Sequence, residues 1–183
     1  MFDTGTKGQI LLYNMEKLKI NPKTIDIVVI SHNHLDHTGG LLDFLRVNQK
    51  AKIYVPNSFP NWTGRIPTIK VSNPTKIAEN VFSTGELKGI EQSLVVGTSK
   101  GFVVVTGCSH PGLKTILTVA STYGKIYGVV GGFHGFNEFE ILKNIHLICP
   151  CHCTMYKEEI YRLFPNQCVK CEVGKVLELS SKN

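Results

Sequence analysis

One short stretch of the chain limits what it can fold into more than any other. Residues 27–30 are all β-branched and apolar, a run too short for a helix, so they predict a buried strand. Directly afterwards the sequence carries three histidines and one aspartate within six positions, and Gly39-Gly40 then precedes apolar residues at helical spacing. A tight loop between a strand and a helix is therefore expected to present four polar side chains: His32, His34, Asp36 and His37.

The spacing of these four residues favours metal binding. His32 and His34 lie two positions apart in an extended segment, so they point the same way and can hold one ion. Asp36 and His37 follow the bend and can face a second ion. Imidazole and carboxylate together suit zinc, iron or manganese better than calcium. The alternative is a surface loop that happens to be rich in histidine, but packing rarely produces this pattern behind a buried strand. We expect two divalent transition-metal ions, with zinc preferred.

The four residues match the signature His-x-His-x-Asp-His, and through it the chain resembles the metallo-β-lactamase fold hydrolases. Further matching stretches resemble a subgroup similar to dihydropterin/ribofuranosyl-aminobenzene-phosphate synthase-like proteins; they are residues 2–5, 106–112, 131–134 and 150–154. The resemblance spans nearly the whole chain. It implies an α+β fold, a four-layer αβ/βα sandwich, with a dinuclear metal site at one edge.

Two strand ends add candidate ligands. His110 follows the apolar strand expected at 102–105, and His152 follows the strand expected at 145–149. The resemblance implies that His152 is the last metal-binding histidine and His110 a third ligand. Many relatives place another histidine near the position of Thr84-Gly85-Glu86, and this chain has none there. We expect His110 to take over that role.

Cys108 stands where many relatives carry a metal-bridging aspartate. As a thiolate it can bind or bridge the ions, because zinc accepts sulfur well, and the alternative is a buried, inert cysteine. His134 lies between glycines at another strand end, where it can bind metal or meet a substrate anion; we favour substrate contact or proton transfer. Asp36 and His134 are thus the candidate catalytic residues, Asp36 also as a metal ligand.

Length and composition fit one domain over residues 1–183. The chain is 42% hydrophobic and 19% charged, which is ordinary for a soluble globular protein with a buried core. No apolar run approaches the roughly 20 residues that span a bilayer, and Met1 leads straight into Phe2-Asp3 rather than a basic and then apolar leader. We expect a cytoplasmic protein without a membrane attachment.

The formal charge of +6 bears on partners. The lysines and arginines are scattered with no run of five, so the charge favours a small anionic substrate, phosphorylated or carboxylated, although solubility explains it equally well. Nucleic acid is not expected, because the sequence lacks a basic stripe with interleaved aromatic residues. The oligomeric state is left open.

Five of the six cysteines lie within residues 149–171. Without a secretory signal they are expected to be reduced thiols. Cys151, Cys153, Cys168 and Cys171 form a C-x-C and a C-x-x-C separated by 14 residues, a spacing that can hold a structural zinc or an iron–sulfur cluster. Against this second site, His152 must point into the main site while its cysteine neighbours point away.

The remaining elements follow from periodicity and breakers. Expected helices cover 8–19, the segment from 41, 113–120, 138–144 and 157–164; expected strands cover 52–55, 66–71, 81–84, 92–97, 101–106, 126–130, 145–149 and 175–179, with a hairpin turn at 98–100. Trp62, in a loop at 59–67, packs over the domain edge or lines a pocket. The resembled family usually carries two or more strands before Phe2-Asp3-Thr4-Gly5, so one sheet is expected to have an exposed edge.

Two functions fit these features. The first is a metal-dependent hydrolase, in which the ions activate water and Asp36 handles its proton. The second is a metal-binding remnant or ligand-binding protein without turnover. Redox members of the resembled family carry glutamate at the second signature position, and His34 there argues against that chemistry.

Overall fold

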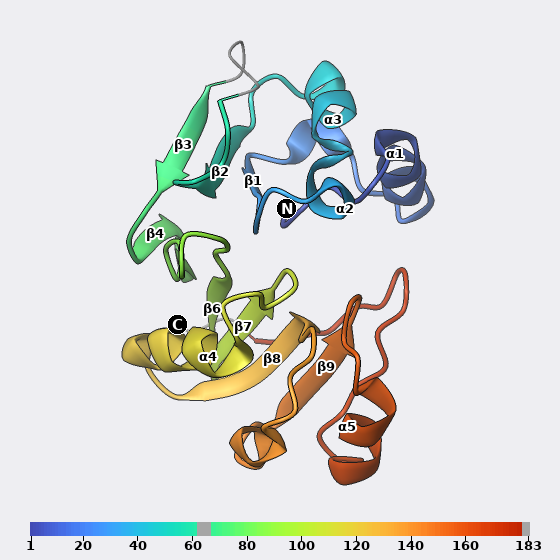
Figure 1. Cartoon of the computed structure of the whole chain (residues 1–183). Helices are drawn as coiled ribbons and strands as arrows, with labels where there is room; N and C mark the ends of the chain where they lie inside the picture. The colour runs from blue at the N-terminus through green and yellow to red at the C-terminus, as the bar shows by residue number, and fades with distance from the viewer. Residues whose placement is uncertain (62–66, 181–183) are drawn as a thin grey trace.

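The computed structural model describes residues 1–61 and 67–180. Two β-sheets lie face to face, and helices cover the outer face of each, which is the expected αβ/βα order (Figure 1). The first sheet is parallel, in the order β1-β2-β3, with bounds β1 Ile27–Val29, β2 Lys52–Pro56 and β3 Thr68–Val71. Its helices are α1 Gly8–Lys17, α2 Leu35–Thr38 and α3 Leu41–Val47, with a 3-10 turn η1 at Pro22–Thr24.

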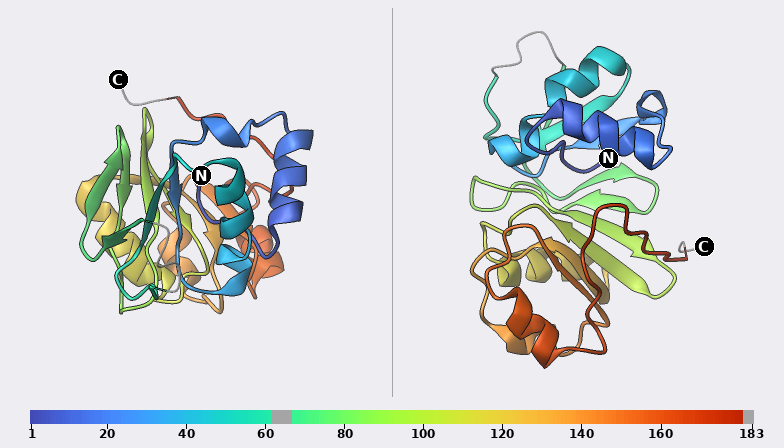
Figure 2. Two further views of the ribbon diagram at one scale, coloured as in Figure 1. Left: turned by 90° about the horizontal axis from the view of Figure 1, so that it is seen from above. Right: turned by 90° about the vertical axis from the view of Figure 1, so that its right-hand side faces the viewer.

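The second sheet has six strands in sequence order. Strands β4 to β7 pair antiparallel, whereas β7, β8 and β9 run parallel to one another. Their bounds are β4 Thr75–Ala78, β5 Val81–Ser83, β6 Leu94–Thr98, β7 Gly101–Thr106, β8 Ile126–Gly132 and β9 Leu147–Cys151. The outer layer holds α4 Leu113–Ala120 and α5 Lys157–Leu163, with 3-10 turns η2 Ser121–Tyr123 and η3 Phe139–Leu142 (Figures 1 and 2).

Side-chain alternation along the strands explains the layers. In β1, Val28 packs into the core beneath α1 and α3, whereas its neighbour Val29 packs between the two sheets. In β7, Val104 faces the core beneath α4, whereas Val105 faces the space between the sheets. Because successive side chains of a strand point to opposite faces, each apolar strand supplies two cores at once.

The first residues of the chain pair with β1. The Val29 amide donates to the Met1 carbonyl and the Asp3 amide donates to the Val29 carbonyl, each at 2.9 Å. Residues 1–3 therefore cover β1 itself, and the edge of this sheet lies at residues 1–3; the expectation of an exposed edge stays a prediction. Trp62 lies outside the described residues.

Several predicted elements differ in the structure. The helix expected at 138–144 is only the four-residue η3, the strand expected at 145–149 begins two residues later as β9, and β4 was not expected. Residues 175–179 are described but form no strand, because their alternating pattern finds no partner strand; most are exposed. The hairpin at 98–100 and the strand at 101–106 are confirmed.

Among the described residues, no helix combines the length and apolar character needed to cross a membrane.

Two adjacent leucines of α3 give a test of this packing. Leu41 is fully buried, whereas the side chain of Leu42 is 49% exposed. Leu41→Ala is expected to lower the free energy of unfolding by about 2–5 kcal/mol through lost burial and the cavity left behind, and Leu42→Ala by under about 1 kcal/mol. Urea unfolding midpoints of the two variants check this. Equal losses of unfolding free energy in the two variants would contradict the burial of Leu41 and the exposure of Leu42 in the structure.

Candidate metal centre

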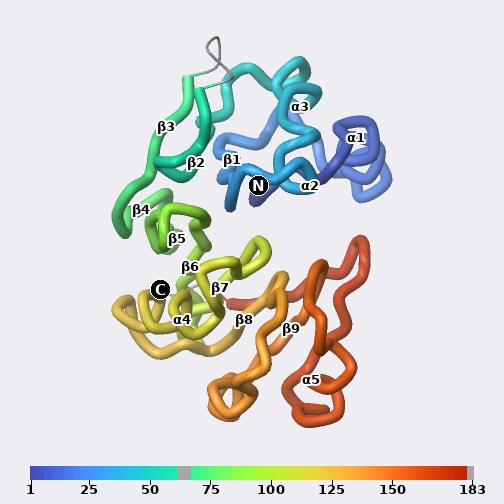
Figure 3. Tube along the Cα trace, viewed as in Figure 1, coloured from blue at the N-terminus to red at the C-terminus, as the bar shows by residue number. Residues whose placement is uncertain are grey.

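Four loops meet between the two halves of the molecule (Figure 3). Strands β7, β8 and β9 are parallel, so their carboxyl ends lie at the same edge of the sheet and carry Cys108, His110, His134 and His152 to one place. The loop after β1 approaches from the other sheet with its own histidines. Residues far apart in sequence thereby form one polar cluster.

A first group of ligand atoms comes from His32, His34 and His110, all within 4.8 Å of one another. His32 Nε2 lies 3.0 Å from His34 Nδ1. The His110 ring centroid lies 4.7 Å from that of His32 and 4.9 Å from that of His34. The structure therefore brings together the pair predicted for one ion and adds His110 to it.

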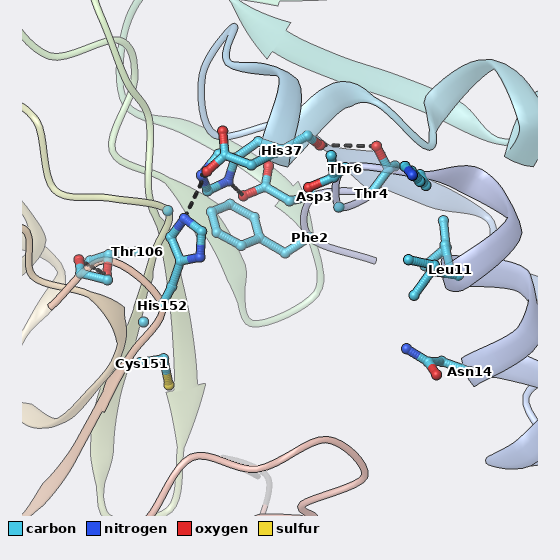
Figure 4. A pocket seen from close by; sticks show the side chains of 17 residues that line it. Phe2, Asp3, Thr4, Thr6, Leu11, Asn14, His37, Thr106, Cys151 and His152 are labelled. Carbon is cyan, nitrogen blue, oxygen red and sulfur yellow. Dashed lines mark hydrogen bonds and ion pairs between the residues drawn. The ribbon is translucent and has the colours of Figure 1, made fainter.

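A second group comes from Asp36, His37, Cys108 and His152. Asp36 Oδ2 lies 2.9 Å from His152 Nε2 and 3.3 Å from His37 Nε2 (Figure 4). Cys108 Sγ lies 3.2 Å from His37 Nε2. Asp36 and His37 were expected in a loop, but they lie on the one-turn helix α2. The His37 ring centroid lies 4.2 Å from that of His32, so the two groups adjoin, while Asp36 reaches His152 after β9.

The chemistry of these residues fits metal ions. His110 Nε2 is buried and has no hydrogen-bond partner among the described residues, a costly state for a polar atom unless a ligand meets it. Burial, together with the neighbouring histidines, lowers the pKa of His32 to about 3, and burial lowers the pKa of His110. Both imidazoles are therefore neutral near pH 7, as metal ligation requires. Nitrogen, carboxylate and thiol donors together suit zinc and related ions.

Burial, helped by the neighbouring Cys153 thiol, raises the pKa of Cys108. This thiol becomes a thiolate at neutral pH only where a strong positive charge lies against it. Its role as a ligand stays a prediction. His134 lies outside both groups: it is exposed, and its ring centroid is 4.9 Å from that of His110.

Asp3 supports the second group, a role that the sequence did not reveal. Its Oδ2 lies 2.7 Å from His37 Nδ1, a distance at which an imidazole N–H donates to a carboxylate, and both its oxygens accept bonds from Ser31. Burial alone would lower the pKa of His37, but the hydrogen bond and charge of Asp3 outweigh it and raise that pKa. Asp3 thereby fixes the ring so that Nε2 faces the site.

Glu91 is the second residue that sequence reasoning missed. It is fully buried, and its Oε1 accepts the amide N–H groups of Gly107, Cys108 and Ser109 at 3.0–3.1 Å. Its Oε2 accepts the amide of His110 at 2.9 Å. One carboxylate therefore fixes the backbone of the whole loop that carries two candidate ligands. The sequence carries only one sign of this role: Glu91 directly precedes the apolar strand expected at 92–97.

The backbone is strained at the same place. Asp3, Ser109, His134 and His152 have positive φ angles of 57°, 63°, 47° and 45°, a region that residues with a Cβ seldom adopt. Strain of this kind clusters at functional sites, where the surrounding structure enforces it. Here it aims His134 and His152 away from the directions their strands would give them.

Two cavities flank the centre. One of about 430 Å³ is lined by Asp36, His37 and His152 on one side and by Lys7 and Leu11 of the α1 region on the other (Figure 4). The second, of about 380 Å³, is lined by His110 and His134 together with residues 135–138. A small molecule in either cavity would lie against one of the two ligand groups.

Comparison with known proteins agrees with this geometry. The family model of the metallo-β-lactamase superfamily matches residues 1–132. The chain belongs to the metallo-β-lactamase superfamily. Members of this superfamily bind metal ions, commonly zinc, and the fold described above is theirs.

The most similar relatives include one synthase and proteins named as metal-dependent hydrolases. The 7,8-dihydropterin-6-methyl-4-(β-D-ribofuranosyl)-aminobenzene-5′-phosphate synthase of Methanocaldococcus jannaschii is 28% identical, over 97% of this chain and 83% of that protein. A metal-dependent hydrolase of Saccharolobus solfataricus is 32% identical over 43% of this chain and 34% of its own length.

Among solved structures, a metal-dependent hydrolase of the β-lactamase superfamily is 30% identical, with a TM-score of 0.80 over 98% of this chain and 88% of that one. A quorum-quenching N-acyl homoserine lactone lactonase, 14% identical, matches in fold with a TM-score of 0.55, over 90% of this chain and 78% of its own.

The four cysteines considered for a separate site are not gathered. Cys153 Sγ lies 3.7 Å from the Cys108 carbonyl oxygen, on the side of the metal centre, and Cys168 packs against the core beneath α4 and α5. The turn at His152 redirects the chain after β9, so Cys153 no longer shares a face with Cys151. The spacing alone could not show this turn.

We expect His110→Ala and His152→Ala to lower the metal content of the purified protein while leaving it folded, because each removes one donor from a strand-end loop. His146→Ala is the control, since His146 is exposed and lies just before β9. Elemental analysis with circular dichroism checks this. An equal loss of metal in His146→Ala would indicate general destabilisation instead of ligation.

Glu91→Gln is expected to lower the free energy of unfolding by about 3 kcal/mol or more and to reduce metal content, because it removes the charge that four amide groups share. Glu86→Gln is the matched control, as Glu86 accepts one exposed amide bond, from Ser58. Urea unfolding and elemental analysis check both variants. Unchanged unfolding in Glu91→Gln would mean that this carboxylate does not hold the loop.

Proposed function

We propose that this protein is a metal-dependent hydrolase that uses two divalent ions, preferably zinc, to activate water. The observation that carries the proposal is the pair of adjacent ligand groups, with the buried, unpartnered His110 Nε2 in one of them. His32, His34 and His110 would hold one ion; Asp36, His37 and His152 would hold the other, with Cys108 beside it. Ions bound there lower the pKa of a bound water toward ~7 and polarise a substrate oxygen.

Asp36 carries the proton chemistry in this proposal. Its side chain is half-exposed, lines the larger cavity and is held by His152. Partial burial opposes its ionisation, but the charge on His37, its own backbone and His152 outweigh this and lower its pKa. The carboxylate can orient a water molecule, accept its proton and pass that proton to a leaving group. His134, exposed at the second cavity, would contact a substrate anion or transfer a proton.

We propose a small anionic substrate, phosphorylated or carboxylated, in the cytoplasm. The net charge of +6 and Lys7 in the wall of the larger cavity favour an anion, and the name of the archaeal relative includes a 5′-phosphate. All six cysteines are free thiols, as a reducing compartment keeps them. A synthase among the relatives is consistent with the same kind of substrate being joined by its enzyme instead of cleaved.

A metal-binding protein without turnover is the second candidate. Cys108 favours it, because this residue occupies a position that the resemblance assigns to a bridging aspartate. Cys108 supplies a negative charge between two ions only if they deprotonate its thiol, whereas an aspartate is already ionised near pH 7.

Asp36→Asn separates the two candidates. If Asp36 handles the proton of the attacking water, the variant is expected to lose activity by several orders of magnitude. Rates on phosphodiesters, esters, lactones and thioesters are measured with metal occupancy alongside. Asp43→Asn is the control, because Asp43 lies on α3 and pairs only with the exposed Arg46 among the contacts described. If the fully metallated parent protein hydrolyses none of the four substrate classes faster than Asp36→Asn does, the hydrolase proposal is overturned.

A further inference from the structure

A second cluster of sulfur atoms lies apart from the metal centre. Cys149 and Cys151 on β9 meet Cys171 of the C-terminal segment, and the three Sγ atoms all lie within 4.8 Å of one another. Cys149 Sγ and Cys151 Sγ are 3.7 Å apart. In Figure 4 Cys151 lies beyond His152 as seen from His37, so its sulfur is not part of the histidine cluster.

Strand geometry explains why these three thiols gather and the fourth does not. Cys149 and Cys151 are two apart on β9, so they share a face, and Ile148, the residue before Cys149, faces the core beneath α4 and α5. The C-terminal segment pairs alongside β9: the Ile148 amide donates to Gln167, and the Val169 amide donates to Ile148, each at 2.9 Å. Cys168 is aligned with Ile148 and therefore faces that core. Cys171, three residues on, reaches the opposite face.

The cluster has the properties of a binding site for a soft ion. Cys149 and Cys151 are buried, and Cys171 is exposed, so the three sulfurs are open to solvent from one side. None of the three belongs to an apolar core cluster of the described residues. Three thiols at this separation match ions that prefer sulfur, of which zinc is the common one in proteins.

We propose that Cys149, Cys151 and Cys171 bind one zinc ion that is separate from the metal centre. This site fastens the C-terminal segment to β9. Beyond Cys171 that segment has no helix or strand in its described part. It approaches the other half of the molecule at Gly174, where an added Cβ would lie 3.1 Å from Leu18 Cδ2, and then returns to the second sheet, where the Ser180 carbonyl accepts the Ser99 amide at 2.9 Å. Because His152 directly follows Cys151, the same ion would steady the backbone of a candidate ligand of the main centre.

The experiment uses the whole chain, reduced and stripped of metal, then reloaded with zinc or with cobalt(II). Cys171→Ser is expected to bind about one zinc ion fewer per chain than the parent and to lose most of the near-ultraviolet thiolate-to-cobalt absorption. Since Cys171 is exposed, its replacement leaves the core intact. Cys149→Ser is expected to give the same loss. Cys108 contributes equally to all these proteins, so the difference reports only the second cluster.

Cys168→Ser is the matched control, because this thiol lies in the same segment but contacts the Ile160 carbonyl at 3.6 Å. It is expected to keep both the metal count and the absorption of the parent. Zinc is also expected to raise the melting temperature of Cys168→Ser by more than that of Cys171→Ser, since an ion that binds only the folded state stabilises it. Equal metal content and absorption in Cys171→Ser and the parent would overturn the site, as would a Cys168→Ser loss as large as that of Cys171→Ser. These readouts do not depend on hydrolysis, so they test the zinc site independently of the proposed function.

Discussion

A buried carboxylate fixes the geometry on which the rest of the site depends. Burying the charge of Glu91 costs several kcal/mol unless hydrogen bonds replace its water. Four consecutive amide N–H groups of residues 107–110 provide this replacement. The loop after β7 must therefore turn its amides inward, and that turn forces Ser109 to a φ of 63°. The side chains of Cys108 and His110 consequently reach the centre in one defined arrangement.

The candidate metal centre lies between the two halves of the fold, and each half supplies part of it. The parallel sheet provides the three histidines and the aspartate that follow β1, and the parallel part of the second sheet provides Cys108, His110 and His152. Such a ligand set exists only in the folded chain, so ion binding would stabilise the packing of one half on the other. Asp3 and Glu91 act from outside the candidate ligand set, one on each half, and orient the candidate ligands.

The C-terminal segment joins the same two halves on another side. It pairs with the edge of β9 through Gln167 and Val169 and then reaches α1 near Leu18. A zinc ion at Cys149, Cys151 and Cys171 would fasten this segment to β9. The described part of the segment beyond Cys171 forms no helix or strand that could do so. Alternation along β9 thus serves two faces: Ile148 stabilises the core, and Cys149 and Cys151, on the opposite face, are available for a ligand.

The sequence by itself determined β1, the cluster of histidines and aspartate behind it, the hairpin of β6 and β7, and the resemblance to the superfamily. These are local signals: a β-branched run, a spacing within six residues and a turn between two apolar strands leave their physical cause in adjacent positions. The tertiary structure alone decided that Asp3 and Glu91 support the centre, that Cys149 replaces Cys153 in the thiol cluster, and that residues 175–179 stay unpaired. Each of these depends on which backbone groups and strand edges meet across the fold. Periodicity along one segment carries no information about such partners, because burial and hydrogen bonding are settled between segments that are distant in sequence.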